Sequence, residues 1–130
     1  MGVVDFLVGR SVVELRYRGA PQLRLVFEHG TAPAPNLYVD LSGVFAYTTT
    51  HGEVSIDPEI PTTLGHVLPI AGATLSEAAV GEDGTLRLSF DDRRLIECSP
   101  DPDYQAWQVS GGAPEWLVVC IARRRARRLG

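Results

Sequence analysis

Two stretches of this 130-residue chain repeat one pattern at a constant offset of 63 positions, without a gap. Residues 7–30 align with residues 70–93, and six of the 24 aligned positions are identical. The identical pairs are Gly9/Gly72, Glu14/Glu77, Leu23/Leu86, Arg24/Arg87, Leu25/Leu88 and Phe27/Phe90. This spacing predicts a unit that consists of a glycine, a strand, a turn and a second strand, built twice and packed into one domain.

Apolar and polar residues alternate along both copies with a period of two, which is typical of an antiparallel sheet that packs on one face. In each copy, a first strand forms a hairpin with a second one. The first strand of the first copy is expected to face inward with Val13, Leu15 and Tyr17. In the following strands, the residues expected on the inward face are Leu23, Leu25, Phe27, Leu86, Leu88 and Phe90.

A third strand follows in each copy, so that the copies span residues 7–41 and 70–98. A further hairpin is expected around His51-Gly52, and a short helix near 61–68 can cover one open sheet edge. The predicted fold is mainly β: two related antiparallel β-meanders that form a sandwich or a flattened barrel. Residues 1–122 are expected to make a single domain.

Composition is that of a soluble globular protein, with 45% hydrophobic and 22% charged residues. The chain starts without a signal-peptide pattern, and its longest apolar run, 116–122, is too short to span a bilayer, so a cytoplasmic protein is expected. Cys98 and Cys120 each lie in a strand-like run and are expected to be buried, reduced thiols. A disulfide would require the two strands to be neighbours.

Charge is divided unevenly along the chain. The net charge is −4, and all twelve basic residues are arginines. Residues 1–122 carry a formal −9, which suits basic partners, whereas the last eight residues carry +5 and attract phosphate, membrane or an acidic surface. The favoured interpretation of 123–130 is a disordered tail that folds back onto its own acidic body. The basic residues of this tail are Arg123, Arg124, Arg125, Arg127 and Arg128.

No pattern of reactive residues points to catalysis. The three histidines lie far apart, in turns or on the short helix, and none has metal-ligand spacing. Carboxylates between Glu77 and Asp103 alternate outward from strands or lie in turns, and the serines and glycines lack nucleophile-elbow or phosphate-loop context. The sequence therefore predicts a protein that is not an enzyme, with no cofactor and no metal site.

The closing segment is the most distinctive. It runs Asp-Pro-Asp-Tyr-Gln-Ala-Trp over 101–107, followed by a Val-Cys strand at 116–120. This resembles the closing Asp-Pro-x-Tyr-x-Ala-Trp and Val-Cys motif of a family of small, uncharacterised actinobacterial β-rich proteins. The Leu-Val-Gly-Arg opening at 7–10 and the Asp-Gly-Thr-Leu-Arg-Leu-x-Phe-Asp-Asp run at 83–92 are similar to that family as well.

The resemblance implies no settled activity, and the chain departs from the family pattern in two places. Gln105 replaces the usual acidic residue, and after Cys120 an arginine run replaces a short apolar strand. We therefore expect the last strand to be missing, which leaves a sheet edge open and favours pairing between two molecules.

The closing segment also supplies the candidate binding residues. Its aromatic side chains either anchor the core, which is the favoured interpretation, or form a binding hot spot, and its aspartates fit turn or capping roles. The candidates are Asp101, Asp103, Tyr104, Trp107 and Trp116.

Function does not follow from any of these patterns. The expected role is a non-enzymatic protein-binding module, in its sharpest form an immunity-type protein that neutralises a basic partner through an acidic face. One alternative is a small-ligand binder that uses a β-barrel interior lined by Tyr104 or Trp107. Another is nucleic-acid association through the arginine tail.

Overall fold

The computed structural model describes residues 4–18, 21–28, 37–101, 105–111, 116–121 and 125–129, and for residue 18 and those from 116 onward it describes the backbone alone. Strands dominate, accompanied by three short 3-10 segments (η). The elements are η1 (Asp5–Leu7), β1 (Val12–Arg18), β2 (Gln22–Phe27), β3 (Leu37–Leu41), β4 (Phe45–Thr49), β5 (Gly52–Ile56), η2 (Pro61–His66), η3 (Leu68–Ile70), β6 (Leu75–Val80), β7 (Leu86–Phe90), β8 (Leu95–Cys98), β9 (Trp107–Gly111), β10 (Trp116–Ile121) and β11 (Arg125–Leu129).

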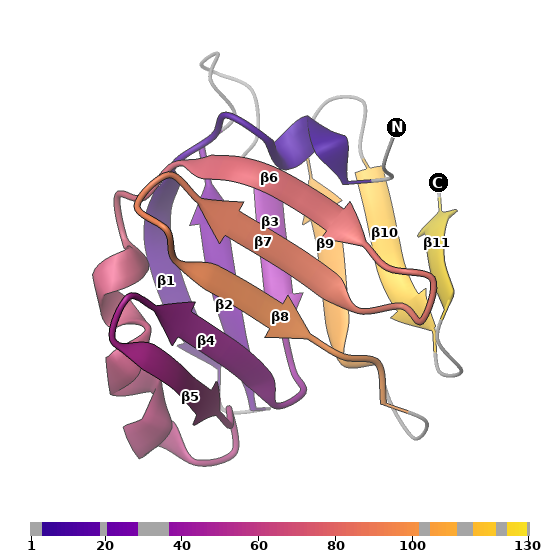
Figure 1. Cartoon of the computed structure of the whole chain (residues 1–130). Coiled ribbons are helices and arrows are strands. Elements are labelled where there is room, and N and C mark those ends of the chain that lie inside the picture. The colour runs from indigo at the N-terminus through magenta and orange to yellow at the C-terminus, as the bar shows by residue number, and fades with distance from the viewer. Residues whose placement is uncertain are drawn as a thin grey trace.

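The strands form two antiparallel sheets that pack face to face (Figure 1). One sheet has six strands in the order β1-β2-β3-β9-β10-β11, and the other has five in the order β5-β4-β8-β7-β6. Both predicted meanders are present, as β1-β2-β3 and β6-β7-β8. The prediction of a mainly β sandwich is confirmed, and the flattened-barrel alternative is not the one adopted.

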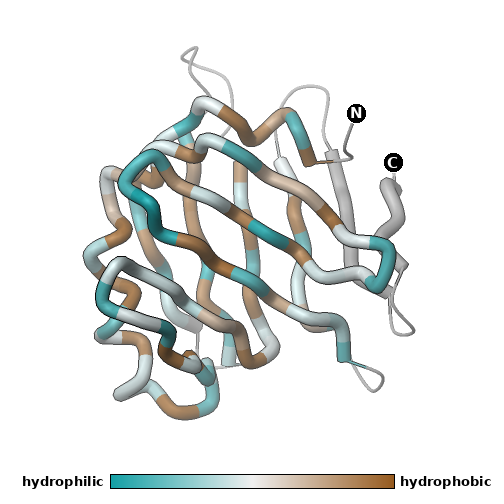
Figure 2. The backbone as a smooth tube through the Cα atoms, viewed as in Figure 1, coloured by the Kyte–Doolittle hydropathy of each residue, from teal (hydrophilic) through white to brown (hydrophobic). Residues whose placement is uncertain are grey.

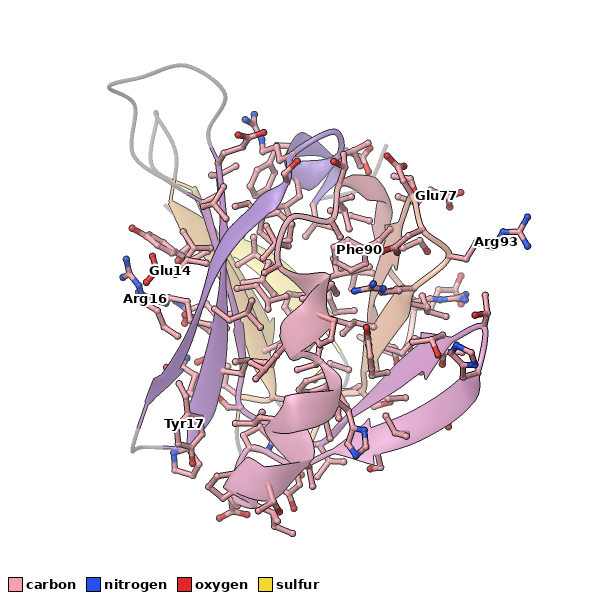
Figure 3. The ribbon with its side chains drawn as sticks, turned by 90° about the vertical axis from the view of Figure 1, so that its left-hand side faces the viewer. Glu14, Arg16, Tyr17, Glu77, Phe90 and Arg93 are labelled. Carbon is pink, nitrogen blue, oxygen red and sulfur yellow. The ribbon has the colours of Figure 1, made fainter. Side chains whose placement is uncertain are left out.

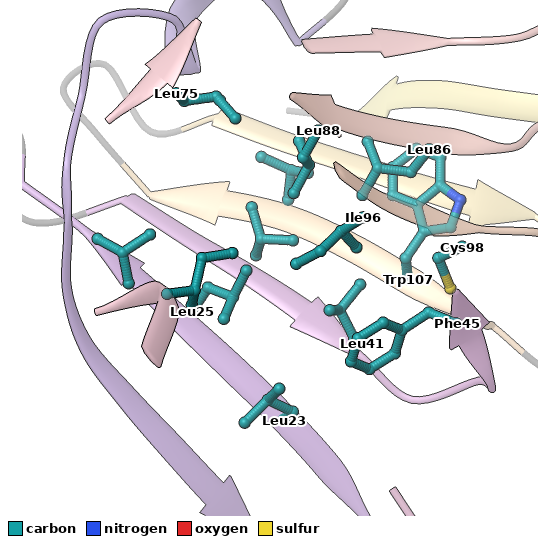
Figure 4. Packing of buried hydrophobic residues seen from close by; sticks show 14 of the residues in the cluster. Leu23, Leu25, Leu41, Phe45, Leu75, Leu86, Leu88, Ile96, Cys98 and Trp107 are labelled. Carbon is teal, nitrogen blue, oxygen red and sulfur yellow. The ribbon is translucent and has the colours of Figure 1, made fainter. Parts of the chain in front are cut away.

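Hydrophobic side chains from both sheets fill the space between them (Figure 4). Brown and teal alternate along the strands in Figure 2, as the period of two requires. All six residues predicted to face inward on β2 and β7 are at most 3% exposed, which confirms that part of the alternation. They are Leu23, Leu25, Phe27, Leu86, Leu88 and Phe90.

The element order of the chain occurs twice. A 3-10 turn and five strands, η1 to β5, are followed by a second 3-10 turn and five strands, η3 to β10. Exchanging β1–β5 for β6–β10 converts the order of one sheet into that of the other, except for β11, which has no counterpart. Each sheet therefore contains three consecutive strands from one half of the chain and a hairpin from the other half.

The two halves meet where β1 and β6 begin, and the backbone bonds there come in matched pairs. The hydroxyl groups of Ser11 and Thr74, 63 positions apart, share a hydrogen bond of 2.8 Å at the centre of this junction. The N–H of Gly9 donates to Leu75 O at 2.8 Å, and 63 residues later the N–H of Gly72 donates to Val12 O at 2.7 Å. Two further pairs are related in the same way: Val12 N–H to Ala73 O with Leu75 N–H to Arg10 O, and Glu28 N–H to Ser11 O with Asp91 N–H to Thr74 O.

A β-bulge in each half corrects one sequence expectation. The pairing register shifts between Val12 and Glu14 in β1, and between Leu75 and Glu77 in β6. Because a bulge inserts one extra residue, Val12 is buried in place of Val13, which is 53% exposed. The expectation that Val13 faces the core is therefore wrong. Tyr17, which was expected on the same inward face, is 46% exposed, whereas Leu15 packs against the core.

The predicted short helix near 61–68 is present as two 3-10 segments, η2 and η3. Gly65 and Pro69, which would lie in the interior of a longer helix, both disfavour a continuous α-helix here. Segment η2 packs beside β5, and the hydroxyl of Tyr17 on β1 donates to the carbonyl of Pro58 just before it, at 2.9 Å. Among the described residues, no helix has the length and apolar character needed to cross a membrane.

Candidate docking surfaces

The candidate binding residues of the closing segment do not converge on a described site. Trp107 begins β9 and is 1% exposed, and its indole N–H donates to Gly84 O in the β6–β7 turn at 2.9 Å. This is the geometry of an aromatic anchor whose polar atom is satisfied inside the core. Asp101 is half-buried after β8, whereas Asp103 and Tyr104 and the side chain of Trp116 lie outside the described residues.

The arginine-rich end differs from its expectation. Residues 125–129 form β11, which pairs antiparallel with β10 and makes an edge of the six-stranded sheet. The expectations of a missing last strand and of a wholly disordered tail are therefore wrong. Arg125, Arg127 and Arg128 lie in this edge strand, while Arg123 and Arg124 lie outside the described residues. Positively charged residues are common on edge strands because they discourage uncontrolled strand addition.

Among the described residues, the cysteines and histidines do not come together in a metal site. Cys98 is fully buried on β8, and its thiol lies 3.7 Å from Ala106 O. Cys120 lies on β10 of the other sheet, so the two strands are not hydrogen-bonded neighbours. His51 and His66 are exposed, and His29 lies outside the described residues. Within the described part of the chain, no three metal-ligating side chains gather.

Charge is segregated between the two sheets. The strands of the six-stranded sheet carry six arginines and two acidic residues, whereas those of the five-stranded sheet carry one arginine and three acidic residues. With its connections, the segment 44–101 holds ten acidic residues and three arginines, a formal −7. This segment contains the whole five-stranded sheet, so negative charge is concentrated on that side of the molecule.

The outer face of the five-stranded sheet is built from small and polar side chains. At its centre Arg87 and Glu97 face each other on β7 and β8, with Nε and Oε2 3.1 Å apart. Their side chains are 56% and 33% exposed, so solvent screens the pair and it contributes little to stability. Around it, Glu53 and Glu77 are exposed on the two edge strands (Figure 3 labels Glu77, which points away from the core).

The outer face of the six-stranded sheet carries the equivalent pair in a different environment. Arg24 on β2 binds Asp40 on β3 through two hydrogen bonds, of 2.7 and 3.0 Å. The carboxylate accepts these bonds and thereby raises the pKa of Arg24. Asp40 is only 2% exposed and Arg24 16% exposed, and the guanidinium lies over the ring of Tyr38, 4.5 Å from its centroid. This bidentate, stacked pair is internally satisfied and acts as a structural cross-link.

A more exposed pair lies nearby on β1. Arg16 Nε donates to Glu14 Oε2 at 2.9 Å, and this hydrogen bond lowers the pKa of Glu14 (Figure 3). Both side chains are more than two fifths exposed, and in Figure 3 they point away from the core. Two arginines and both acidic residues of this sheet's strands are therefore paired with each other, whereas Glu53 and Glu77 of the other sheet have no ion-pair partner among the described residues.

The edge strand β5 has a feature that sequence reasoning missed. Its residues pair on one side with β4, and within the described part of the chain no strand is bonded to its other side. Gly52, Glu53 and Ser55 are exposed. Beyond Ile56 the edge closes, because Thr63 Oγ1 accepts a hydrogen bond of 3.0 Å from the N–H of Asp57. The alternation of residues 52–56 predicted this strand, but only the strand order shows that it is an edge.

Comparison with known proteins places most of the chain in a protein family. Residues 34–128 match the model of a family described as a family of unknown function (DUF6188). The matched range runs from just before β3 into β11, which is more than two thirds of the chain. No curated protein and no solved structure matches the chain.

Proposed function

Because the chain belongs to the DUF6188 family, whose function is unknown, we propose a role from its surfaces: a non-enzymatic module that binds a basic partner protein. The observation that carries this proposal is the concentration of negative charge, a formal −7, in residues 44–101. An acidic face of this kind accelerates the encounter with a basic protein and fixes its orientation. The sharpest form of the role is an immunity-type protein that covers the working surface of a basic toxin.

The compartment and origin in this proposal are those expected from the sequence, namely the cytoplasm of a bacterium of the actinobacterial type. The segment 101–107 and the following Val-Cys strand lie inside the range matched by the family. We propose that Trp107 has a structural role in the family, since its indole N–H anchors β9 to the β6–β7 turn.

The small-ligand alternative has less support. Side chains from both sheets fill the interior. Trp107, which in this alternative would line a ligand pocket, is one of these core side chains. Nucleic-acid association through the arginine-rich end would have to overcome the acidic half of the molecule.

The experiment is an affinity capture with matched charge variants. The intact chain is immobilised and exposed to extract of its native host at 50 mM and at 500 mM salt. We expect one predominantly basic protein to bind at low salt and to be released at high salt, because the range over which exposed charges interact shortens from about 10 Å at 0.1 M salt to about 3 Å at 1 M.

Two double variants locate the surface. Glu53→Gln with Glu77→Gln neutralises two exposed acids of the five-stranded sheet. Glu14→Gln with Glu28→Gln neutralises two exposed acids on β1 and just after β2, on the six-stranded sheet. Both changes raise the net charge equally. Loss of the basic protein from the first variant alone is the expected result, and equal retention by both variants, or capture of no basic protein, contradicts the proposal.

A further inference from the structure

The two halves of the chain differ at one sheet edge. The exchange that converts one sheet order into the other places β10 on β5, and the equivalent residue pairs are set by the shared registers. Val118 opposite Val109 corresponds to Val54 opposite Tyr47, so residues 116–120 correspond to 52–56. In the second half this edge is occupied, because β11 pairs with β10. In the first half, the equivalent edge of β5 is bonded to no strand among the described residues, although η2 packs beside β5 and Thr63 of η2 binds Asp57 just beyond its end.

We propose that β5 is an acceptor edge that binds an extended, basic segment of the partner protein by strand addition. This inference rests on the proposed function and names the place and the form of the contact. Backbone N–H and C=O groups along an open edge bind an added strand whatever its sequence, while neighbouring side chains select it. The same scaffold already accepts an antiparallel strand at the equivalent edge of β10.

The strand that occupies the equivalent edge indicates the chemistry of the occupant. Strand β11 contains three arginines in five residues, and Val118 and Val119 are paired with Arg128 and Arg127. In the same register, an added strand would place basic residues opposite Val54 and Ser55, next to Glu53. Glu53 is exposed and has no ion-pair partner among the described residues, so it is available to a cation on the added strand.

A second copy of this chain is the competing occupant, and charge disfavours it. Pairing β5 with β5 of another molecule would bring two segments of formal charge −7 together. Like charges that meet across an interface oppose association. A basic strand gains the same backbone bonds without this repulsion.

The test uses the intact ¹⁵N-labelled chain and a synthetic peptide with the sequence of residues 123–130, Arg-Arg-Arg-Ala-Arg-Arg-Leu-Gly. Amide hydrogen exchange is measured by NMR with and without saturating peptide. We expect the amides of the strand segment 52–56 that face the open edge to exchange at least tenfold more slowly with peptide bound. The control peptide replaces the alanine by proline, which keeps the charge and removes a backbone donor; it is expected to give no such protection.

A variant of the chain tests the charge contribution. Glu53→Gln should weaken peptide binding by about two- to fivefold, which corresponds to roughly 0.4–1 kcal/mol and is typical of an exposed ion pair. Glu14→Gln changes an acid on β1, in the six-stranded sheet, and should leave peptide binding unchanged.

Several outcomes would overturn the acceptor edge. Peptide binding that protects other residues, or that is equal for the proline peptide, leaves basic-partner binding intact and removes strand addition at β5. If the peptide displaces β11 from β10, it binds at the edge of β10 and not at that of β5, which contradicts the proposal. Protection of 52–56 that appears without peptide and grows with protein concentration identifies a second copy as the occupant. Failure of both peptides to bind at low salt counts against the edge, whereas the proposed function is judged separately by the capture experiment.

Discussion

At the scale of single residues, burial decides what an ion pair contributes. Arg24–Asp40 and Arg87–Glu97 occupy equivalent positions of the two sheets, since each arginine is paired across the strand with its acid. The first pair is almost removed from solvent, and the second is largely in water. A carboxylate taken out of water depends on its partner, whereas an exposed one is stabilised by solvent.

This contrast gives a prediction for the two acids. Asp40→Asn should lower the free energy of unfolding by about 3–5 kcal/mol, because it leaves the largely buried guanidinium of Arg24 without its counter-charge. Glu97→Gln should lower it by less than about 1 kcal/mol. Urea unfolding followed by circular dichroism measures both values. Similar losses for the two variants would show that burial does not separate the pairs.

Side-chain burial could be predicted from the sequence where alternation is regular. The inward residues of β2 and β7 follow from a period of two, and Trp107 fits the expectation of a core aromatic. The partnership of Arg24 and Asp40 could not be predicted, because sixteen residues separate them and cross-strand register depends on the turn between β2 and β3.

At the scale of elements, a tight turn precedes β1 and β6 in the same conformation. Gly9 and Gly72 have φ angles of +89° and +92°, a region that side chains with a Cβ rarely adopt. The N–H of each glycine also donates to the strand of the other half. These glycines set the point at which each half crosses to its neighbour, and this explains why both aligned positions hold glycine.

Substitution of either glycine should therefore be costly to a similar degree. Gly9→Ala and Gly72→Ala are each expected to destabilise the fold by roughly 1–2 kcal/mol, from the backbone conformation alone, since a Cβ at either position has no atom within 4 Å. Gly65→Ala is the matched control, because it also has open space and no positive φ. It should be neutral or slightly stabilising in thermal unfolding. A loss at Gly65 equal to the other two would refute the conformational explanation.

Element boundaries were predictable to within a few residues, but bulges and edges were not. A bulge depends on how β1 meets residues 72–73 of the other half, and such a long-range contact has no local signature. The last strand was expected to be missing, because an arginine run stands where the similar family has a short apolar strand. Pairing with β10 provides the backbone bonds that composition alone does not reveal.

At the scale of the whole molecule, the exchange of hairpins makes the halves dependent on each other. Strands β4 and β5 complete the sheet of the second half, and β9 and β10 complete that of the first. Neither half contains a finished sheet, so the sandwich is expected to fold and unfold as one unit.

Cooperativity can be measured with a core substitution in one sheet and a reporter in the other. Leu88→Ala, in the five-stranded sheet, should cost about 2–5 kcal/mol, because it removes a fully buried side chain. The transitions reported by fluorescence, to which Trp107 of the six-stranded sheet contributes, and by far-ultraviolet circular dichroism should shift together. Separate midpoints for the two signals would show that the sheets unfold independently.

The sequence repeat pointed to a duplicated unit, but its offset of 63 covers only η1, β1 and β2 and their counterparts. The later strands correspond with other offsets, because the connections differ in length. The surfaces proposed to act in binding therefore emerge only when the sheet order is known.

Among the described residues, ten strands correspond in pairs between the two halves of the chain, and β11 has no counterpart. A molecule built from two equal halves would present two equivalent open sheet edges to a partner. Here the chain's own last strand already occupies one of them, so a partner that binds by strand addition should bind with a stoichiometry of one molecule per chain.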